Sequence, residues 1–291
     1  MFFEILDKTL YLKHNFNEEF GSFEEYLSKF ISSDPVLQYM PISFFCSGKK
    51  IRSILYFKFF TGKNSIDHKK KLNTIAIIEI IHTASIIHDD VVDNNKKRRT
   101  SDSFLEMFGR KKSILIGDYI LIKAIKSFLN LHSDKFLQTL FLRECSAIAY
   151  GATLEQFLTK DATLSQYIRV ASLKTSPLFK LSCFLGTYLS SNDFEKSKKA
   201  ATFGTCFGIL FQVQNDLDGY NYENFKDSED YVEKNITFPI IILRDYFGYQ
   251  INEFFSSSQS GYERIVNLIR TDRFRDITIK VMNKYNSICS N

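Results

Sequence analysis

The amino-acid sequence predicts an all-α fold, and three observations support that prediction. The 291 residues contain only 12 glycines and 4 prolines, about half the usual share of these residues, which argues against a loop-rich β fold. Apolar residues recur at intervals of three and four, as at Ile75, Ile78 and Ile81, which is the spacing of one helix face. The alternating patterns typical of strands are scarce. We therefore expect a single domain over residues 1–291, with roughly ten helices joined by short loops.

The predicted helices follow one another with short polar segments between them. The helix expected over 74–88 is apolar on nearly all sides, so we place it at the centre of the bundle. The same spacing predicts helices over 114–128, 144–157, 167–189, 200–218 and 236–247.

Composition argues against several classes of protein. The net charge is +5, and no block of Lys and Arg is dense enough to indicate nucleic-acid binding, whereas a basic cleft for a phosphorylated small molecule fits this charge. The five cysteines are scattered and form no CxxC pair, so we expect no disulfide framework, no zinc site and a cytoplasmic protein. The sequence contains no run of about 18 uncharged apolar residues, so we expect no transmembrane span.

Three carboxylates, Asp89, Asp90 and Asp93, stand at the end of the strongly apolar helix. Asp89 and Asp93 are about 40° apart on a helix surface, one turn from each other. Two acids this close repel each other unless a cation lies between them, and oxygen ligands in this arrangement suit Mg²⁺. The helix dipole also disfavours negative charge at this end, so stability alone does not explain the acids. A solvated acidic helix end is the alternative for this short pattern by itself.

Four cations, Lys96 to Arg99, follow the three acids directly. A diphosphate needs both kinds of group, because metal ions and guanidinium groups can hold its oxygens from different sides. The alternative is a surface loop with local salt bridges. We interpret residues 89–99 as a candidate diphosphate site.

The chain resembles the trans-isoprenyl diphosphate synthase family from about Ser47 to Leu243. Ser47-Gly-Lys-Lys-Ile-Arg52 is similar to the family's GGKRxRP, with Ser47 for the first Gly and Ser53 for Pro. Residues 79–99 match the first aspartate-rich motif. Phe108-Gly, Ile116-Gly-Asp-Tyr-Ile120, Lys174-Thr175 and Phe211-Gln-Val-Gln-Asn-Asp216 follow in the family's order.

The resemblance implies an isoprenoid-synthase-type helical bundle around a central cavity, with trans-prenyltransferase activity. An allylic diphosphate, such as the geranyl, farnesyl or geranylgeranyl compound, ionises while about three Mg²⁺ ions hold its diphosphate between two acidic motifs. The double bond of isopentenyl diphosphate attacks the allylic cation, and a proton is then lost. By analogy, the family also implies a homodimer.

The resemblance assigns roles residue by residue. Metal-binding or catalytic roles fall on Asp89, Asp90, Asp93, Lys174, Asn215 and Asp216, and isopentenyl diphosphate contacts fall on Lys49, Arg52, His82 and Arg99. Allylic diphosphate contacts fall on Arg98, Lys174, Thr175, Gln212 and Lys234. His82 precedes Asp89 by seven residues, so both lie on one side of the predicted helix.

The second acidic motif departs from the family's DDxxD. Asn215 replaces its first Asp and Gly219 its last. An Asn carbonyl can bind Mg²⁺ but carries no charge, so we expect weaker metal binding there, for which Asp218 could partly compensate. The later pattern DLxxGKxTLP corresponds to residues 230–239, with its Lys displaced by one residue to Lys234, and Lys226 is the fallback for that role.

Two alternative functions remain open. Asn215-Asp216, Gly219 and Glu223 resemble the NDxxSxxxE motif of terpene cyclases, with Gly where Ser is usual. A cyclase needs no isopentenyl diphosphate site, and the presence of those residues favours prenyl transfer. The other alternative is a weakly active subunit of a heteromeric synthase.

The positions just before Asp89 predict product length. In this family they line the tunnel of the growing chain, and here Ala84 and Ser85 are both small. We therefore expect a product of C20 or longer, although small residues would also allow close helix packing. Gln156 fits either a functional amide near the metal site or a buried, hydrogen-bonded amide.

Overall fold

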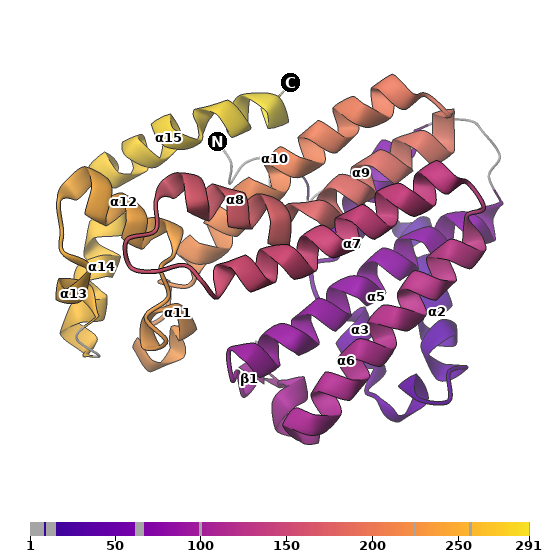
Figure 1. The fold of residues 1–291 in the computed structure, drawn as a ribbon, viewed down its shortest axis with the longest axis horizontal. Helices are drawn as coiled ribbons and strands as arrows, with labels where there is room; N and C mark the ends of the chain where they lie inside the picture. Colours follow the sequence, from indigo (N-terminus) through magenta and orange to yellow (C-terminus); the bar gives the residue numbers. More distant parts are fainter. Residues whose placement is uncertain are drawn as a thin grey trace. The chain divides into compact units, whose positions relative to one another are not determined.

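The computed structural model describes residues 9, 16–61, 67–98, 101–223, 225–255 and 258–290, and these residues form an all-α fold (Figure 1). The predicted fold class is confirmed. Two short strands, β1 (Lys97–Arg98) and β2 (Ser101–Asp102), form the β-hairpin of the described part, with Lys97 opposite Asp102.

The chain divides into two compact units. The N-terminal unit contains Lys8–Glu144 and Leu181–Ala201, and the C-terminal unit contains Cys145–Lys180 and Thr202–Asn291. Helices α7, α9 and α10 contribute residues to both units. The single domain over 1–291 and its central cavity stay predictions.

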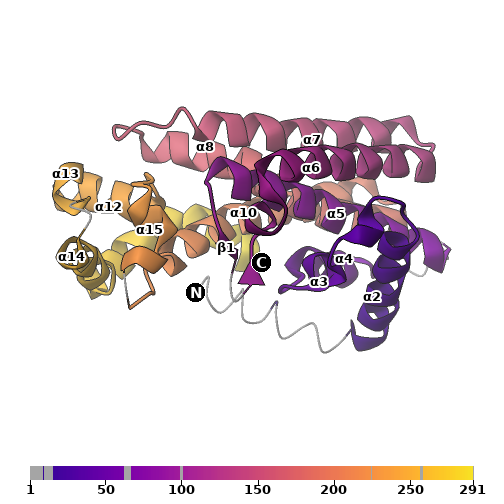
Figure 2. The ribbon, with the colours of Figure 1, turned by 90° about the horizontal axis from the view of Figure 1, so that it is seen from below.

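The N-terminal unit is built around helix α5, which spans His68–Val92. Helix α6 contacts α5 over much of its length, and α2, α3 and α4 contact it as well (Figure 2). Every residue from Thr74 to Ile81 is buried. This agrees with the central position predicted for a helix that is apolar on nearly all sides. Full burial of one Ile contributes roughly 1.5–3 kcal/mol to folding, so this helix anchors the unit. The bounds are α2 Asn17–Ser32, η2 Leu37–Tyr39, α3 Ile42–Cys46, α4 Ile51–Phe59 and α6 Phe104–Leu131.

Local capping explains where two of these helices begin. The Asp67 side chain accepts a hydrogen bond from the Lys69 N–H at the start of α5. The Ser103 hydroxyl accepts one from the Glu106 N–H at the start of α6. Such caps satisfy N–H groups that have no partner inside the helix. The helix predicted over 114–128 lies within α6.

The C-terminal unit is helical as well. Its elements are part of α7 (Lys135–Glu155), α8 (Leu164–Lys174), part of α9 (Ser176–Ser191), most of α10 (Phe194–Asp218), η3 (Phe225–Asp227), α11 (Glu229–Val232), α12 (Phe238–Phe247), α13 (Ile251–Phe254), α14 (Gln259–Ile269) and α15 (Asp272–Ser290). Thr163 begins α8 with a capping box, in which Gln166 bonds back to the Thr163 N–H. The helices predicted over 200–218 and 236–247 correspond to α10 and α12.

Two predicted helix bounds were wrong. The single helix expected over 167–189 is two helices, α8 and α9, which break at Thr175. Pro177 explains the break, because it has no N–H to donate and its ring clashes with the carbonyl four residues earlier. The helix expected over 144–157 ends at Glu155, and Gln156 is exposed just beyond it. A buried amide at Gln156 is therefore excluded.

The helices of the described residues are too short or too polar to cross a membrane.

Candidate active site

The first acidic motif lies at the C-terminal end of α5. The Asp93 N–H donates to the Asp89 carbonyl oxygen at 2.8 Å, so the two acids are one helical turn apart. Both side chains are half-buried, whereas Asp90 is fully buried. Of the three predicted ligands, Asp89 and Asp93 therefore have the solvent access that a metal ion would need.

Arg110 of α6 offsets the unfavourable placement of acids at this helix end. Its Nη1 donates to the Val91 carbonyl at 3.1 Å, and its Nη2 donates to Asn94 Oδ1 at 3.1 Å. A cation at a helix C-terminus is stabilising by about 0.3–1 kcal/mol. Arg110 thus holds the turn that carries Asp93. No sequence motif pointed to Arg110, because the contact joins two helices.

The cationic loop after this motif is only partly described. Lys97 forms an ion pair of 2.5 Å with Asp102 across the hairpin, which agrees with the local salt bridge weighed as an alternative. Arg98 belongs to β1. Arg99 lies outside the described residues, so its contact with isopentenyl diphosphate stays a prediction.

Buried Glu79 of α5 organises the segment that contains Lys49 and Arg52. Glu79 Oε1 accepts hydrogen bonds from the Ser53 N–H at 3.3 Å and from its hydroxyl at 2.6 Å. Lys50 Nζ lies 3.5 Å from Glu79 Oε2 and also bonds to the Phe45 carbonyl. The family's proline would have no N–H at position 53, so Ser53 gives this chain an additional bond to Glu79.

The predicted isopentenyl diphosphate residues of this unit differ in exposure. Lys49 is exposed, while His82 on α5 is half-buried. Burial lowers the pKa of Arg52 to about 10, and the Glu79 carboxylate acts in the opposite direction. Arg52 therefore keeps its charge at neutral pH, and Glu79 is the acidic group that stabilises it.

The two predicted chain-length residues lie on α5 one turn before Asp89. Ala84 is buried, and Ser85 is half-buried with its hydroxyl donating to the His82 carbonyl at 2.8 Å. Their roles in chain length stay predictions.

The second acidic motif lies at the end of α10, where Asp216 is the centre of a buried network. Its Oδ2 accepts from the Tyr167 hydroxyl at 2.7 Å and from the Phe238 N–H at 2.9 Å. Its Oδ1 accepts from Gln212 Nε2 at 2.8 Å, and Gln212 Oε1 in turn accepts from the Thr175 hydroxyl at 2.6 Å. The fold thus brings together three residues predicted for the site: Thr175, Gln212 and Asp216.

The electrostatics of Asp216 follow from this burial. Burial, together with the negative charge of nearby Asp230, raises the pKa of Asp216 to about 7, although the three hydrogen bonds to its carboxylate act in the opposite direction. The pKa of Asp230 is also raised, first by burial. To bind a metal ion, the Asp216 carboxylate would have to give up some of its present hydrogen bonds. Its role as a metal ligand stays a prediction.

The other residues of this motif are more accessible. Asn215 is exposed, and so is Asp218, whose Oδ1 accepts from Gln214 at 2.7 Å. Helix α10 ends at Asp218. At Gly219, Oδ2 of Asp230 lies 2.8 Å from the position that a Cβ would take.

Lys174 is held at the end of α8. Its Nζ lies 2.5 Å from Glu155 Oε2, at the end of α7. The two helices come very close here, since a Cβ at Gly151 would lie 2.4 Å from the Lys174 backbone nitrogen. Glu155 was missed by the sequence analysis, because its partner is 19 residues away.

The Lys234 segment differs from the family pattern in a specific way. Lys234 is exposed and has a left-handed backbone with φ of 59°, a conformation that favours glycine. This agrees with its place at the Gly of DLxxGKxTLP. Asn235 holds the place of the family's Lys, and its Nδ2 donates to Asp230 Oδ1 at 3.2 Å. The diphosphate contact of Lys234 stays a prediction.

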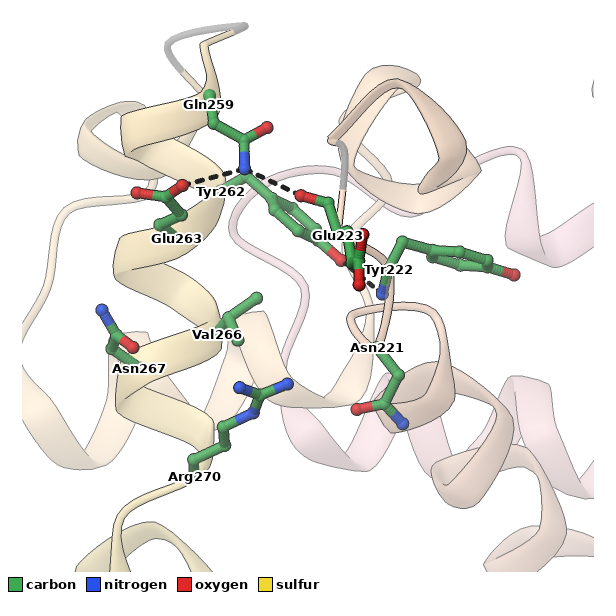
Figure 3. A pocket seen from close by; sticks show the side chains of 9 residues that line it. All are labelled: Asn221, Tyr222, Glu223, Gln259, Tyr262, Glu263, Val266, Asn267 and Arg270. Atoms are coloured by element: carbon green, nitrogen blue, oxygen red, sulfur yellow. Dashed lines mark hydrogen bonds between the residues drawn. The ribbon is translucent and has the colours of Figure 1, made fainter.

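A pocket of about 300 Å³ lies between the loop after α10 and helix α14 (Figure 3). Gln259 Nε2 bridges the Glu223 carbonyl and Glu263 Oε1, both at 3.0 Å, and the Tyr222 N–H donates to the Tyr262 hydroxyl at 3.0 Å. Glu223 therefore belongs to a loop that is bonded to α14, and it does not continue α10.

The donor set can be compared with the needs of a metal ion. The described residues contain no preformed group of three or more His, Cys, Asp or Glu side chains arranged as a metal site. Nevertheless, Asp89 and Asp93 offer oxygen donors one turn apart on a half-exposed surface. That chemistry suits Mg²⁺, which usually completes its shell with waters and phosphate oxygens.

Comparison with known proteins places this chain. It is 30% identical to geranylfarnesyl diphosphate synthase of Methanosarcina mazei over 58% of this chain and 57% of that protein. It is 34% identical to octaprenyl diphosphate synthase of Escherichia coli over 50% of this chain and 46% of that protein. The chain thus spans about half the length of the curated relatives that it matches.

The fold has solved relatives as well. The structure matches the crystal structure of a polyprenyl synthase from Caulobacter crescentus with a TM-score of 0.80 at 20% identity, over 96% of this chain and 89% of that one. The family model for polyprenyl synthetase matches residues 35–261. The chain therefore belongs to the polyprenyl synthetase family.

Proposed function

We propose that this protein is a trans-prenyltransferase that condenses isopentenyl diphosphate with an allylic diphosphate of the geranyl, farnesyl or geranylgeranyl type. The observation that carries the proposal is the intact first motif, with Asp89 and Asp93 one turn apart and half-exposed at the end of α5. Its matched relatives are named as synthases of prenyl diphosphates, which supports the same reaction class.

The two substrates require different groups. For the allylic diphosphate, Lys174 provides a cation held by Glu155, and Thr175 and Gln212 provide polar atoms fixed by the Asp216 network. For isopentenyl diphosphate, Lys49 and Arg52 provide positive charge, with His82 on α5. In both cases cations bind phosphate oxygens through charge-assisted hydrogen bonds.

Asp89 and Asp93 would hold divalent metal ions, with Asn215 as an oxygen donor of the second motif. When bound, Mg²⁺ neutralises the departing diphosphate and so promotes cleavage of the carbon–oxygen bond. The Caulobacter crescentus polyprenyl synthase was crystallised in complex with calcium and isoprenyl diphosphate, which supports divalent metal binding in this fold. The number of about three Mg²⁺ ions is part of the proposal.

The end of α10 favours this function over a terpene cyclase. In NDxxSxxxE the three ligand positions are four residues apart, so they share one face only if the helix continues through all of them. Here α10 ends at Asp218, and Glu223 belongs to the loop bonded to Gln259 of α14. The cyclase pattern therefore lacks the continuous helix that it needs.

A homodimer in the cytoplasm completes the proposal. Helix α6 exposes Leu115 (68% exposed) and Ile122 (66%), which are seven residues apart and so lie on the same face. Large exposed apolar side chains at such spacing suit a helix-to-helix contact between two copies. Light scattering with size-exclusion chromatography would measure the mass in solution, and a monomer at micromolar concentration would contradict the dimer.

One assay separates the three functional alternatives. The purified protein is incubated with farnesyl diphosphate, radiolabelled isopentenyl diphosphate and Mg²⁺. Label in longer, acid-labile prenyl diphosphates is the expected result, with a product of C20 or longer. Hydrocarbon formed without isopentenyl diphosphate would indicate a cyclase, and activity that needs a second protein would indicate a subunit of a heteromeric synthase.

A further inference from the structure

The end of α10 and the start of α11 share one small volume. Oδ2 of Asp230 lies 2.8 Å from the position of a Cβ at Gly219. Real Cβ atoms essentially never have neighbours this close, so a side chain at 219 and the Asp230 carboxylate in its present position exclude each other. Glycine at 219 is therefore a condition for the observed position of Asp230.

Position 219 is where the second acidic motif normally ends. It follows Asn215 by four residues, and its N–H donates to the Asn215 carbonyl at 3.0 Å, as in one more turn of helix. A side chain there would lie beside Asn215 on the same face. The DDxxD pattern has its last carboxylate at this position, and here the carboxylate of another helix occupies the space.

The Asp230 carboxylate is oriented by its surroundings. Its Oδ1 accepts from Asn235 Nδ2 at 3.2 Å, while Oδ2 is the oxygen nearest to Gly219. The buried Ser228 hydroxyl donates to the Gly219 carbonyl at 2.6 Å, which ties the start of α11 to the end of α10. This hydrogen bond therefore holds the backbone that carries Asp230 next to position 219.

Two departures from the family pattern are thus linked. The last acid of DDxxD is Gly219, and the Lys of DLxxGKxTLP is Asn235, which is neutral and bonds to Asp230. The first departure leaves room for the Asp230 carboxylate, and the second places an amide where the family's cation would neutralise it. Both changes leave beside position 219 an Asp230 carboxylate that no lysine at position 235 pairs with.

We propose that Asp230 supplies, from α11, the carboxylate that the second acidic motif lacks at position 219. The proposal rests on the proposed function, because it concerns the divalent metal and diphosphate of the same site. It assigns Asp230 a role in metal affinity that Asp218, the residue suggested by the sequence, does not have.

The test measures Mn²⁺ binding by the full chain in the presence of inorganic pyrophosphate, using titration calorimetry. Asp230→Asn keeps the shape and the Asn235 bond but loses the charge, and we expect Mn²⁺ affinity to fall about 10–100-fold. Glu233→Gln removes an exposed carboxylate three residues away and is the matched control, with affinity expected within about twofold of wild type. Circular dichroism checks that each variant is folded.

An exchange of the two side chains gives a second, independent reading. Gly219→Asp alone should lower the melting temperature, because its Cβ meets Asp230. The double variant Gly219→Asp/Asp230→Gly returns the acid to α10, and we expect it to bind Mn²⁺ within about threefold of wild type. A folded double variant that binds as weakly as Asp230→Asn would overturn the proposal.

Two further outcomes would also overturn it. One is an Asp230→Asn variant with the affinity of Glu233→Gln, and the other is a large loss in Asp218→Asn but not in Asp230→Asn. The proposed function is tested separately by the elongation assay and by Asp89→Ala. Its failure would therefore be visible as missing product in the wild-type chain, whatever the Mn²⁺ titrations of Asp230 give.

Discussion

Nζ of Lys174 lies 2.5 Å from Oε2 of Glu155, so the last residue of α8 is held by the last residue of α7. The pair is partly exposed, with 21% of the Lys174 side chain and 34% of the Glu155 side chain accessible. It therefore contributes little to stability by itself. The effect of the ion pair is to hold the Lys174 ammonium group in one place, where a diphosphate could bind to it.

The first prediction concerns Lys174. Hydrogen bonds to charged groups contribute about 1.5–3 kcal/mol, so Lys174→Ala should raise KM for the allylic diphosphate about 10–100-fold. Glu155→Gln, which keeps an acceptor for Lys174, should have a smaller effect. Steady-state kinetics would check this, with the exposed Lys199→Ala as control. Equal KM values for the two lysine variants would contradict the role of Lys174.

The second prediction concerns Asp89. Asp89→Ala removes one carboxylate from the pair at the end of α5, and elongation should fall by at least about 100-fold. The fold should persist, because the half-buried Asp89 side chain does not form the core. Product radioactivity and circular dichroism measure the two effects, and Asp161→Ala, at an exposed acid, is the control. A near-normal rate would refute the metal-binding role.

The third prediction concerns Asn215. Asn215→Asp restores the family's first acid at an exposed position, so it should cost little stability. Because a charged ligand binds Mg²⁺ more tightly than a carbonyl, the Mg²⁺ concentration for half-maximal rate should fall several-fold. A titration of Mg²⁺ against turnover measures this. An unchanged titration curve would mean that Asn215 does not contact the metal.

The fourth prediction concerns product length. Ala84→Phe places a bulky ring one turn before Asp89, and it should shorten the products if position 84 lines the tunnel. Chromatography of the dephosphorylated products gives their length. Ala149→Phe, at an exposed alanine of α7, is the control. Unchanged products would leave helix packing as the reason for the small residue at position 84.

The fifth prediction concerns pH and stability. Burial, together with the positive charge of Lys70, lowers the pKa of His132 to about 4, although Asp134 acts in the opposite direction. Nε2 of His132 lies 3.0 Å from the Thr74 hydroxyl, and the ring packs on Phe128. In the unfolded chain the pKa of the His132 imidazole is about 6.5, so the unfolded state binds the proton more strongly than the folded state. The contribution of neutral, buried His132 to the free energy of unfolding is therefore fully present above about pH 6.5, and it is lost as the pH falls toward 4.

The expected loss between those two values is about 3 kcal/mol in the free energy of unfolding. His132→Asn should flatten the dependence of unfolding on pH in that window, whereas the exposed His68→Asn should not. Urea unfolding at a series of pH values measures it. A His132→Asn curve parallel to that of wild type would show that His132 does not titrate in this range.

Patterns within one helix were readable from the sequence because they depend only on helical spacing. Apolar residues on nearly all sides of the helix predicted that α5 is buried over residues 74–81. The spacing also placed Asp89, Asp90 and Asp93 correctly at the end of this helix. The wrong prediction of one continuous helix over 167–189 also has a cause within that segment. Pro177 breaks the helix expected over 167–189, because a proline inside a helix lacks the N–H that the helix needs.

Contacts between distant residues were decided only by the tertiary structure. Glu79 meets Ser53, Lys174 meets Glu155, and Asp230 lies beside Gly219. In each pair the partners come from different parts of the chain, so no periodicity within one helix relates them. The burial of Asp216 is of the same kind, since its partners Tyr167 and Phe238 belong to α8 and α12.

The sequence by itself therefore determined the helical class, the family motifs and the acidic end of α5. The tertiary structure decided which of those acids reach the surface, which bonds hold the cations, and which helix provides the carboxylate beside Gly219. The physical reason is that helix formation and motif spacing are local properties of the chain, whereas the burial and hydrogen bonding of a charged group depend on what packs against it.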